Sequence, residues 1–460
     1  MEHSMALILA AGEGTRMKSR KAKVLHEICG MSLLEWVHHS VKKAGIKKTV
    51  VVVGHKAEEV KEKMGDQVGY AFQKEQLGTG HAVMQAQDHI NNNEGHILVL
   101  CGDTPLISSE TISEAVNFHK TYNNSATIIT AEFQEPEGYG RIVRDESGAV
   151  KKIVEHKDAK DDEKNIKEIN SGMYCFNAKD LKTALAGLSN NNSQGEYYLT
   201  DTIEILLNGG KNVGAYKVGD NKEVLGINDR VQLAYASGII KNKILENIMR
   251  NGATIIDPTS TYIDWGAKVG ADTVIYPSTF IRGKTQIGEN CTIGPGTTIE
   301  DCKIACGARI INSVVCKSIV DENTNIGPFA YIRPGSHIGR EVKIGDFVEI
   351  KKSKIGDGTK ISHLTYVGDA EIGKNVNLGC GVVVVNYDGQ KKNKTVVGDN
   401  SFVGCNVNLI SPVEVGDNAY VAAGSTITDS VPENSLAIAR ERQIIKADWV
   451  TKRGTPKKGK

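Results

Sequence analysis

The C-terminal half of the chain carries aliphatic residues at a constant spacing of six. Three runs keep this spacing, over residues 269–299, 326–350 and 397–427. No helix or coiled coil has this period, whereas the hexapeptide repeats of a β-helix do, because each hexad supplies one short strand and one corner. Glycine follows the aliphatic residue at Gly398 and Gly404, where a corner turns most easily without a Cβ. The pattern predicts stacked parallel coils that bury a continuous aliphatic column.

The N-terminal half has a different pattern, in which apolar strands alternate with helices. Strands are predicted over residues 6–11, 50–53 and 97–100, and helices over residues 33–44 and 81–89. This alternation indicates an α/β fold with a Rossmann-like mixed sheet, whose ligands bind beyond the C-terminal ends of its parallel strands.

The segment between the two halves has a third pattern, that of a helix. From Leu233 to Ile248 the apolar residues stand at helical spacing, and Asn251 and Gly252 follow as a stop signal. We therefore expect an α/β domain at residues 1–229, a linker helix at 230–250 and the repeat domain, with a C-terminal tail, at 251–460.

The loop after the first strand is a candidate phosphate site. Gly12 and Gly14 allow backbone N–H groups to approach phosphate oxygens, and Arg16 and Lys23 add positive charge. Glycines after a strand also make ordinary tight turns, so the loop alone leaves both interpretations open. The loop lacks the complete motif of a Walker loop or of a dinucleotide-binding fold.

Asp103 directly follows the strand predicted over residues 97–100. A carboxylate in that position can hold a divalent cation against phosphates, and Mg²⁺ uses only one or two such ligands. An N-cap or turn role is the alternative for Asp103. The carboxylate and the glycine-rich loop together favour metal-assisted nucleotidyl transfer.

Composition restricts the partners and the location. The 56 Lys and Arg against 55 Asp and Glu leave a net charge of +1, which favours neither a nucleic-acid groove nor a membrane-binding face. Nine cysteines do not make a disulfide framework, and no secretory signal or membrane span is present, so we expect a cytoplasmic protein. Cys302 and Cys306 lie close in sequence but lack the further ligands of a metal site. Residues 452–460 are basic and are expected to be a disordered tail.

The repeat region also contains residues that do not follow the hexad rule. Arg333 and Lys351 can bind a phosphate near His363, whose ordinary pKa of about 6.5 suits a general base. A solvated corner pair and an incidental histidine are the alternatives. Residues 386–394 interrupt the repeat and are expected to leave the coil as a loop.

Motifs along both halves resemble those of sugar-nucleotide pyrophosphorylases, with a hexad domain behind them. In the first half these are LAAGEGTRMKSRKAKVLH, QKEQLGTGHAV, CGDTPL, GYGRIV, IVEHKDA, EINSGMYCF, GEYYLTD and GINDR, and in the second IRPGS, FVEIKKS, SHLTYVGDAEIG, NLGCG, VNYDG, FVGCNVNL, YVAAGSTIT and AIARERQ. The whole set resembles the GlmU family of bifunctional bacterial enzymes, over nearly all of the chain. The resemblance implies a left-handed β-helix, a homotrimer, and synthesis of UDP-N-acetylglucosamine as a cell-envelope precursor.

For the first half, the resemblance implies a site for UTP and N-acetylglucosamine 1-phosphate, with no covalent intermediate. Arg16 and Lys23 would face the triphosphate as catalytic residues, and Asp103 and Asn228 would hold Mg²⁺. Gln73, Gly78 and Thr79 would contact the uracil base, and Gly140, Glu155 and Asn170 would hold the sugar. The other residues implied to line this site are Leu9, Ala10, Ala11, Gly12, Lys23, Cys101, Gly102, Asp103 and Asn228.

For the second half, the resemblance implies that His363 takes a proton from the amine of glucosamine 1-phosphate as the amine attacks acetyl-CoA. The implied sugar-phosphate ligands are Arg333, Lys351, Tyr366 and Asn377, and the implied acetyl-CoA ligands are Cys380, Asn386, Tyr387, Cys405, Ala423 and Arg440. Cys380 and Cys405 replace Ala and Ser of many relatives, and residues 382–385 lack the usual Thr. These changes affect side-chain contacts to the thioester and leave backbone contacts in place. Ser171 replaces a Thr beside Asn170.

Two other interpretations compete with a bifunctional enzyme. In the first, the repeat domain is purely structural and only the nucleotidyltransferase is active, which leaves His363 and its cationic neighbours without a role. In the second, the chain is a non-enzymatic scaffold for protein partners, which leaves the glycine-rich loop and Asp103 unexplained.

Overall fold

The computed structural model describes residues 3–192 and 194–454. Its contacts divide into two compact units, Met1–Lys241 and Asn242–Lys460, and the division falls inside helix α9 (Arg230–Arg250). This helix covers the residues for which the apolar spacing predicted one. The domain limits at residues 229 and 251 stay predictions.

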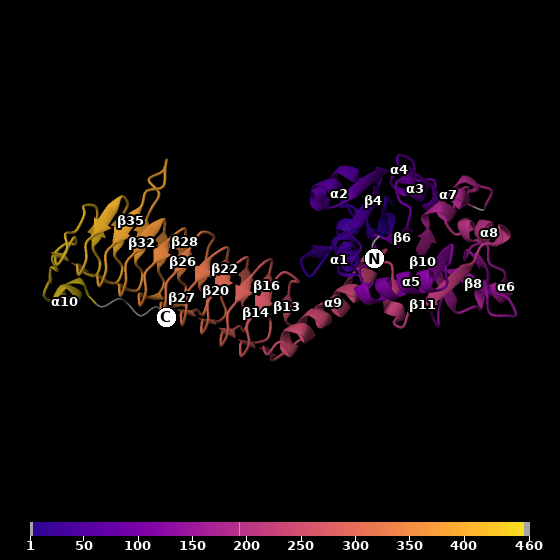
Figure 1. Cartoon of the computed structure of the whole chain (residues 1–460). Coiled ribbons are helices and arrows are strands. Elements are labelled where there is room, and N and C mark those ends of the chain that lie inside the picture. Colours follow the sequence, from indigo (N-terminus) through magenta and orange to yellow (C-terminus); the bar gives the residue numbers. More distant parts are fainter. Residues whose placement is uncertain (1–2, 193, 455–460) are drawn as a thin grey trace. The chain divides into compact units, whose positions relative to one another are not determined.

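The first unit is built on a mixed sheet with the strand order β11-β7-β10-β6-β1-β4-β5 (Figure 1). Strands β6, β1, β4 and β5 are parallel, and β10 runs antiparallel to β6 and β7, as expected for a mixed sheet. A hairpin of β8 and β9 joins through β10. The strands are β1 (Ser4–Ala10), β4 (Lys48–Val53), β5 (Gly69–Phe72), β6 (His96–Cys101), β7 (Ala126–Glu132), β8 (Gly140–Arg144), β9 (Val150–Val154), β10 (Glu168–Asn177) and β11 (Val213–Lys217), with β2 (Glu27–Ile28) and β3 (Met31–Ser32) as a separate pair.

Both faces of this sheet are buried. In β1, Ala6 and Ile8 pack into one apolar cluster, whereas Met5 and Leu7 pack into another. This explains the continuous apolar run, because a parallel strand covered on both faces has no solvent side. The helices are α1 (Leu33–Lys43), α2 (Ala57–Met64), α3 (Thr79–Met84), α4 (Gln87–Asn91), α5 (Ser109–Thr121), α6 (Asp161–Lys164), α7 (Ala178–Ala186) and α8 (Asp201–Asn208), with 3-10 turns η1 (Thr15–Met17), η2 (Lys23–Leu25), η3 (Gly65–Gln67) and η4 (Asn221–Val224).

Local signals explain where the helices begin and end. Helix α1 begins with a capping box, in which Ser32 Oγ accepts from the Glu35 N–H and Glu35 Oε2 accepts from the Ser32 N–H. The region predicted to be helical, residues 81–89, forms helix in two pieces. Two short helices, α3 and α4, lie there because the backbone leaves helical geometry at the buried Ala86 (φ −93°, ψ 15°).

The second unit is a β-helix of three parallel sheets (Figure 1). The sheets run from β12 (Thr254–Ile255) to β41 (Leu436–Ala437), from β13 (Tyr262–Ile263) to β40 (Thr426–Ile427), and from β14 (Lys268–Val269) to β38 (Val413–Val415). The hexad residues point inward: Ile332, Ile350 and Val367 pair in register and are fully buried. The predicted hexapeptide β-helix is therefore confirmed.

The strands that carry candidate site residues lie in the later coils. They are β27 (Lys343–Asp346), β28 (Glu349–Lys351), β30 (Lys360–His363), β31 (Tyr366–Gly368), β33 (Asn377–Leu378), β34 (Val383–Val385), β35 (Thr395–Val397), β36 (Phe402–Val403) and β39 (Tyr420–Val421). The predicted loop lies between β34 and β35 and is closed by a bridge between Tyr387 and Lys392. A short helix, α10 (Trp449–Arg453), follows the coils, and residues 455–460 of the predicted tail lie outside the described residues. Among the described residues, none of the helices is long and apolar enough to cross a membrane.

Candidate functional site

The centre of the first candidate site is the side chain of Lys23. Its Nζ contacts an oxygen of Asp103 and lies 3.2 Å from Asn228 Oδ1. Lys23 lies on η2, Asp103 directly after β6, and Asn228 just before α9, so three distant segments meet at the C-terminal ends of the parallel strands. All three side chains are only partly exposed. The residues predicted for phosphate and metal binding therefore lie in one place.

The glycine-rich loop lies against the stem of Lys23. Gly14 has a φ of +64°, and a Cβ there would lie 2.6 Å from Lys23 Cβ. Any other residue would be strained and would displace the lysine. Arg16 is exposed on η1, Gly12 has open space around it, and the Gly102 N–H donates to Leu9 O at 2.9 Å. The loop therefore leaves Gly12 and Arg16 exposed next to the stem of Lys23.

The residues predicted for the sugar also lie together. Gly140 pairs with Asn170 between β8 and β10, and a Cβ on Gly140 would lie 3.4 Å from Glu155 Oε2. Glu155 accepts from Thr200 Oγ1 at 3.2 Å, and burial raises the pKa of its carboxyl group. Asn170 donates to the Tyr174 hydroxyl at 2.7 Å. Thr200 and Tyr174 were not predicted, since nothing in their sequence context marks them.

Two further predicted residues of this unit, Cys101 and Gln73, are largely shielded from solvent, and this affects their chemistry. Burial raises the pKa of the Cys101 thiol to about 12, so the thiol is neutral at pH 7. Gln73 is buried and donates to the Gly78 carbonyl at 3.2 Å, while Thr79 Oγ1 accepts from the Leu199 N–H at 3.1 Å. Gln73, Gly78 and Thr79 therefore lie together, as the proposed base site requires.

The second candidate site contains a histidine–carboxylate pair. His363 Nδ1 lies 2.6 Å from Asp346 Oδ1, and the two residues are direct register partners of β30 and β27. This hydrogen bond lowers the pKa of Asp346, which therefore stays ionised at neutral pH. Because a carboxylate only accepts, Nδ1 carries the ring proton of neutral His363 and Nε2 keeps its lone pair. Asp346 was not predicted from the sequence, although the coil spacing of 17 residues places it opposite His363.

Two cationic residues of this unit have carboxylate partners one coil away. Arg333 Nη1 lies 2.7 Å from Glu349 Oε1, and Lys351 Nζ lies 3.0 Å from Asp369 Oδ2. Asp369 also accepts from Asn386 Nδ2, so Lys351 and Asn386 share one carboxylate. Glu349 and Asp369 were likewise not predicted from the sequence.

A second lysine lies beside Lys351. The neighbouring Lys351 ammonium lowers the pKa of Lys392, a residue of the loop between β34 and β35. Tyr366 and Asn386 approach each other over Gly368, where a Cβ would lie 2.3 Å from the Tyr366 hydroxyl oxygen and 2.8 Å from Asn386 Nδ2. Two adjacent cations with polar neighbours favour an anionic ligand.

The residues predicted for acetyl-CoA follow one corner of successive coils. Asn406 N–H donates to Cys380 O and Gly424 N–H donates to Cys405 O, both at 2.8 Å, so residues 380, 405 and 423 stack. Arg440 Cδ lies 3.7 Å from the Cβ position of Gly424. Tyr387 is exposed on the projecting loop, and Asn377 lies on β33 without a hydrogen bond to the other predicted ligands in the described part of the chain.

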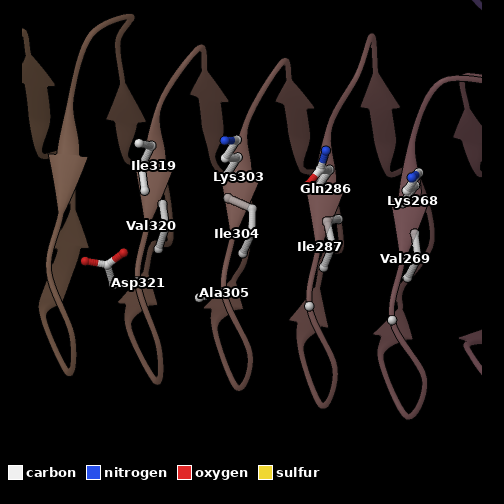
Figure 2. A pocket seen from close by; sticks show the side chains of 12 residues that line it. Lys268, Val269, Gln286, Ile287, Lys303, Ile304, Ala305, Ile319, Val320 and Asp321 are labelled. Atoms are coloured by element: carbon white, nitrogen blue, oxygen red, sulfur yellow. The ribbon is translucent and has the colours of Figure 1, made fainter.

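A hollow of about 450 Å³ lies away from these residues, along β14, β17 (Gln286–Ile287), β20 (Lys303–Ile304) and β23 (Ile319–Val320). Figure 2 shows Lys268, Gln286 and Lys303 in line along this sheet. The hollow contains none of the predicted site residues. Among the described residues, no group of three or more His, Cys, Asp or Glu could hold a metal ion.

Comparisons with known proteins find related sequences along nearly the whole chain. The nucleotidyl transferase model matches residues 5–225, the bacterial transferase hexapeptide model matches residues 266–301, and the GMPPB C-terminal domain model matches residues 314–435. The bifunctional protein GlmU of Acetivibrio thermocellus is 69% identical over 99% of this chain and 98% of its own. The GlmU proteins of Caldanaerobacter subterraneus and Clostridioides difficile are 56% and 53% identical, over 98% and 97% of this chain and 99% and 97% of their own.

The chain belongs to the bifunctional GlmU family. The predicted fold class and the predicted bifunctional role in UDP-N-acetylglucosamine synthesis are thereby confirmed. The interpretations of the chain as a non-enzymatic scaffold and of the repeat domain as purely structural are set aside. The family membership does not assign individual residues, so their roles stay predictions.

Proposed function

We propose that uridylyl transfer takes place around Lys23, Asp103 and Asn228, and acetyl transfer around His363 and Asp346. The first assignment rests on the contacts of Lys23 Nζ with the Asp103 carboxylate and with Asn228 Oδ1. The observation that carries the second is the 2.6 Å contact that leaves His363 Nε2 available as a base.

Asp103 and Asn228 fit Mg²⁺. A carboxylate and an amide oxygen are hard donors, and both approach the same cationic group, Lys23 Nζ, so a cation is favoured between them. Mg²⁺ bound there would neutralise charge that develops on the pyrophosphate.

In uridylyl transfer, a phosphate oxygen of N-acetylglucosamine 1-phosphate attacks the α-phosphorus of UTP, and pyrophosphate leaves. Lys23 and Arg16 hold the triphosphate and stabilise its growing negative charge, while Gly140, Glu155 and Asn170 orient the sugar. No residue has to form a covalent bond.

In acetyl transfer, the amine of glucosamine 1-phosphate attacks the thioester carbon of acetyl-CoA, and the thiol of coenzyme A leaves. His363 Nε2 takes the amine proton, and Asp346 holds the ring and stabilises the imidazolium that forms. Arg333, Lys351 and Lys392 bind the sugar phosphate through their charge.

Among the predicted acetyl-CoA ligands, Cys380, Cys405, Ala423 and Arg440 follow one corner of the coils, whereas Asn386 and Tyr387 lie at the start of the loop between β34 and β35. We propose that a homotrimer brings these groups together with a neighbouring subunit, as the family resemblance implies. The cytoplasmic location, too, stays a prediction from the cysteine content.

The test compares wild type with His363→Ala in two assays, acetyl-CoA consumption with glucosamine 1-phosphate and UTP-dependent pyrophosphate release with N-acetylglucosamine 1-phosphate. We expect acetyl transfer to fall about 10²- to 10⁴-fold with pyrophosphate release unchanged. His337→Ala is the matched control, since His337 also pairs with a carboxylate, Asp321, at 2.8 Å in the same unit. Equal acetyl transfer in the His363→Ala variant and wild type would refute the assignment.

A further inference from the structure

The first turn of helix α9 is attached to the proposed metal ligands. Asp229 is the N-cap of this helix, and its Oδ1 accepts from the Gln232 N–H at 2.8 Å. Gln232 Oε1 in turn accepts from the Asn228 N–H at 2.7 Å. The preceding residue, Ile227, donates its N–H to the Asp103 carbonyl at 2.8 Å. The start of α9 therefore fixes Asn228 and joins it to the strand end that carries Asp103.

Arg230, the first residue of α9, links this helix start to two other segments of the site. Its Nε donates to the Met17 carbonyl at 3.3 Å, and its Nη1 donates to His26 Nδ1 at 3.2 Å. A guanidinium group only donates, so Nδ1 must be the acceptor. Met17 ends the turn η1, which carries Arg16, and His26 directly follows the turn η2, which carries Lys23. One side chain thus holds both turns that carry the proposed phosphate-binding cations.

Both partners of Arg230 are fixed parts of the fold. Met17 and His26 are buried, and in the described part of the chain His26 Nε2 has no hydrogen-bond partner. Burial, and then the charge of Arg230, lower the pKa of His26, which is therefore neutral at pH 7 and can accept from the guanidinium group. A cation in the first turn of a helix is unfavourable in the field of the helix dipole. The contacts with the two turns give Arg230 a reason to occupy this position.

We propose that Arg230 is a positioning residue for uridylyl transfer, which sets the turns of Arg16 and Lys23 against the pair of Asp103 and Asn228. This inference rests on the proposed function, in which these four residues hold the metal and the triphosphate. A backbone hydrogen bond already joins the segments of Asp103 and Asn228, so the loss of Arg230 displaces mainly the two cationic turns. The effect should therefore fall on UTP and not on the sugar phosphate.

The experiment measures kcat and KM for both substrates of pyrophosphate release in wild type, Arg230→Met and Arg230→Lys. We expect Arg230→Met to lower kcat/KM for UTP about 10²-fold, the effect of a displacement of about 1 Å at a catalytic group. KM for UTP should rise, and KM for N-acetylglucosamine 1-phosphate should stay constant. Arg230→Lys keeps the charge but lacks the fork that reaches two acceptors, so we expect a loss of about tenfold.

The matched control is Arg250→Met, at the other end of α9, where the arginine pairs with Glu246 on the same helix. This variant should have wild-type kinetics. A fall in kcat alone in Arg230→Met, with constant KM for UTP, would refute the positioning role, because a smaller fraction of folded enzyme has that effect. If Arg230→Met does not fold, His26→Phe, which removes one acceptor, replaces it. A wild-type KM for UTP in His26→Phe would then overturn the proposal.

Lys23→Met separates this inference from the proposed function. If Lys23→Met releases pyrophosphate at the wild-type rate, the proposed site itself is wrong. If Lys23→Met loses this activity but Arg230→Met keeps the wild-type kcat/KM for UTP, only the positioning role of Arg230 is refuted.

Discussion

The two candidate sites are assembled in opposite ways. In the α/β unit, Lys23 contacts residues that are 80 and 205 positions away in sequence. In the β-helix, His363 contacts Asp346 over 17 positions and Lys351 contacts Asp369 over 18. One site depends on the order of strands in a sheet, and the other on the length of a coil.

This difference determines how each site tolerates change. A coil contacts only the coils on either side of it, so its stability is close to a sum of local terms. The α/β site brings together segments that are far apart in sequence. Their relative positions are set by the whole sheet, so the geometry of the site depends on the packing of the domain. The following predictions test this comparison, in order of decreasing expected effect.

Lys23→Met tests whether the α/β site depends on one charge. Methionine keeps the apolar stem under Gly14 but removes the ammonium group that contacts Asp103 and Asn228. We expect pyrophosphate release to fall about 10³-fold, with acetyl transfer unchanged. Lys21→Met, at an exposed lysine 3.5 Å from Glu27, is the control and should match wild type in both assays. Loss of both activities in Lys23→Met would contradict independent sites.

Ile355→Ala tests whether the hexad column stabilises its own unit. Ile355 is buried between Ile338 and Ile372, its register partners in the adjacent coils. We expect the free energy of unfolding of the β-helix to fall by about 2–5 kcal/mol. Calorimetry measures this loss of unfolding free energy. The control is Lys354→Ala, at the exposed residue next to Ile355. If the unfolding transition of the α/β unit shifted instead, the prediction that each coil stabilises only its own unit would be wrong.

Acid should destabilise the α/β unit through His119. Burial lowers the pKa of this fully buried imidazole to about 4, with His96 at 5.0 Å. The unfolded chain takes up a proton near pH 6.5 and the folded chain only near pH 4. The unfolding free energy should therefore be unaffected above pH 6.5 and fall by about 3 kcal/mol between these values.

Denaturant unfolding at several pH values measures this loss in wild type and in His119→Gln, which keeps a polar group near Thr127. The variant should show a weaker dependence on pH over the same range. A variant with the same slope as wild type would assign the acid sensitivity to other groups. His337→Gln in the β-helix is the control.

Asp346→Asn should have the smallest effect. The amide oxygen still accepts from His363 Nδ1, but the negative charge that stabilises the imidazolium is lost. We expect kcat for acetyl transfer to fall about tenfold, which corresponds to the roughly 1.5 kcal/mol of one hydrogen bond to a charged group, with KM for acetyl-CoA nearly constant. The control is Asp357→Asn, which removes a carboxylate that pairs with Arg340 at 2.9 Å outside the site. This variant should have the acetyl-transfer kcat of wild type. A change in KM alone would place Asp346 in substrate binding.

Much of this architecture could be predicted from the sequence. The hexad spacing identified the inward residues, such as Ile332 and Ile350, and the register confirms them. The helix pattern placed α9 and the helical region at residues 81–89, but helical spacing does not reveal the break at Ala86 within that region. The resemblance implied the catalytic role of His363 but did not identify Asp346. Asp346 is found only when residues one coil apart are paired.

The sequence by itself determined the period of the coils, the strand and helix alternation, and the identity of the chemical groups, because these depend on local patterns of burial and turning. Only the tertiary structure decided which groups meet. It placed Asn228 beside Lys23 and gave His363 its carboxylate. The physical reason is that hydrogen bonds act over about 3 Å, a range that sequence separation specifies only where the fold repeats.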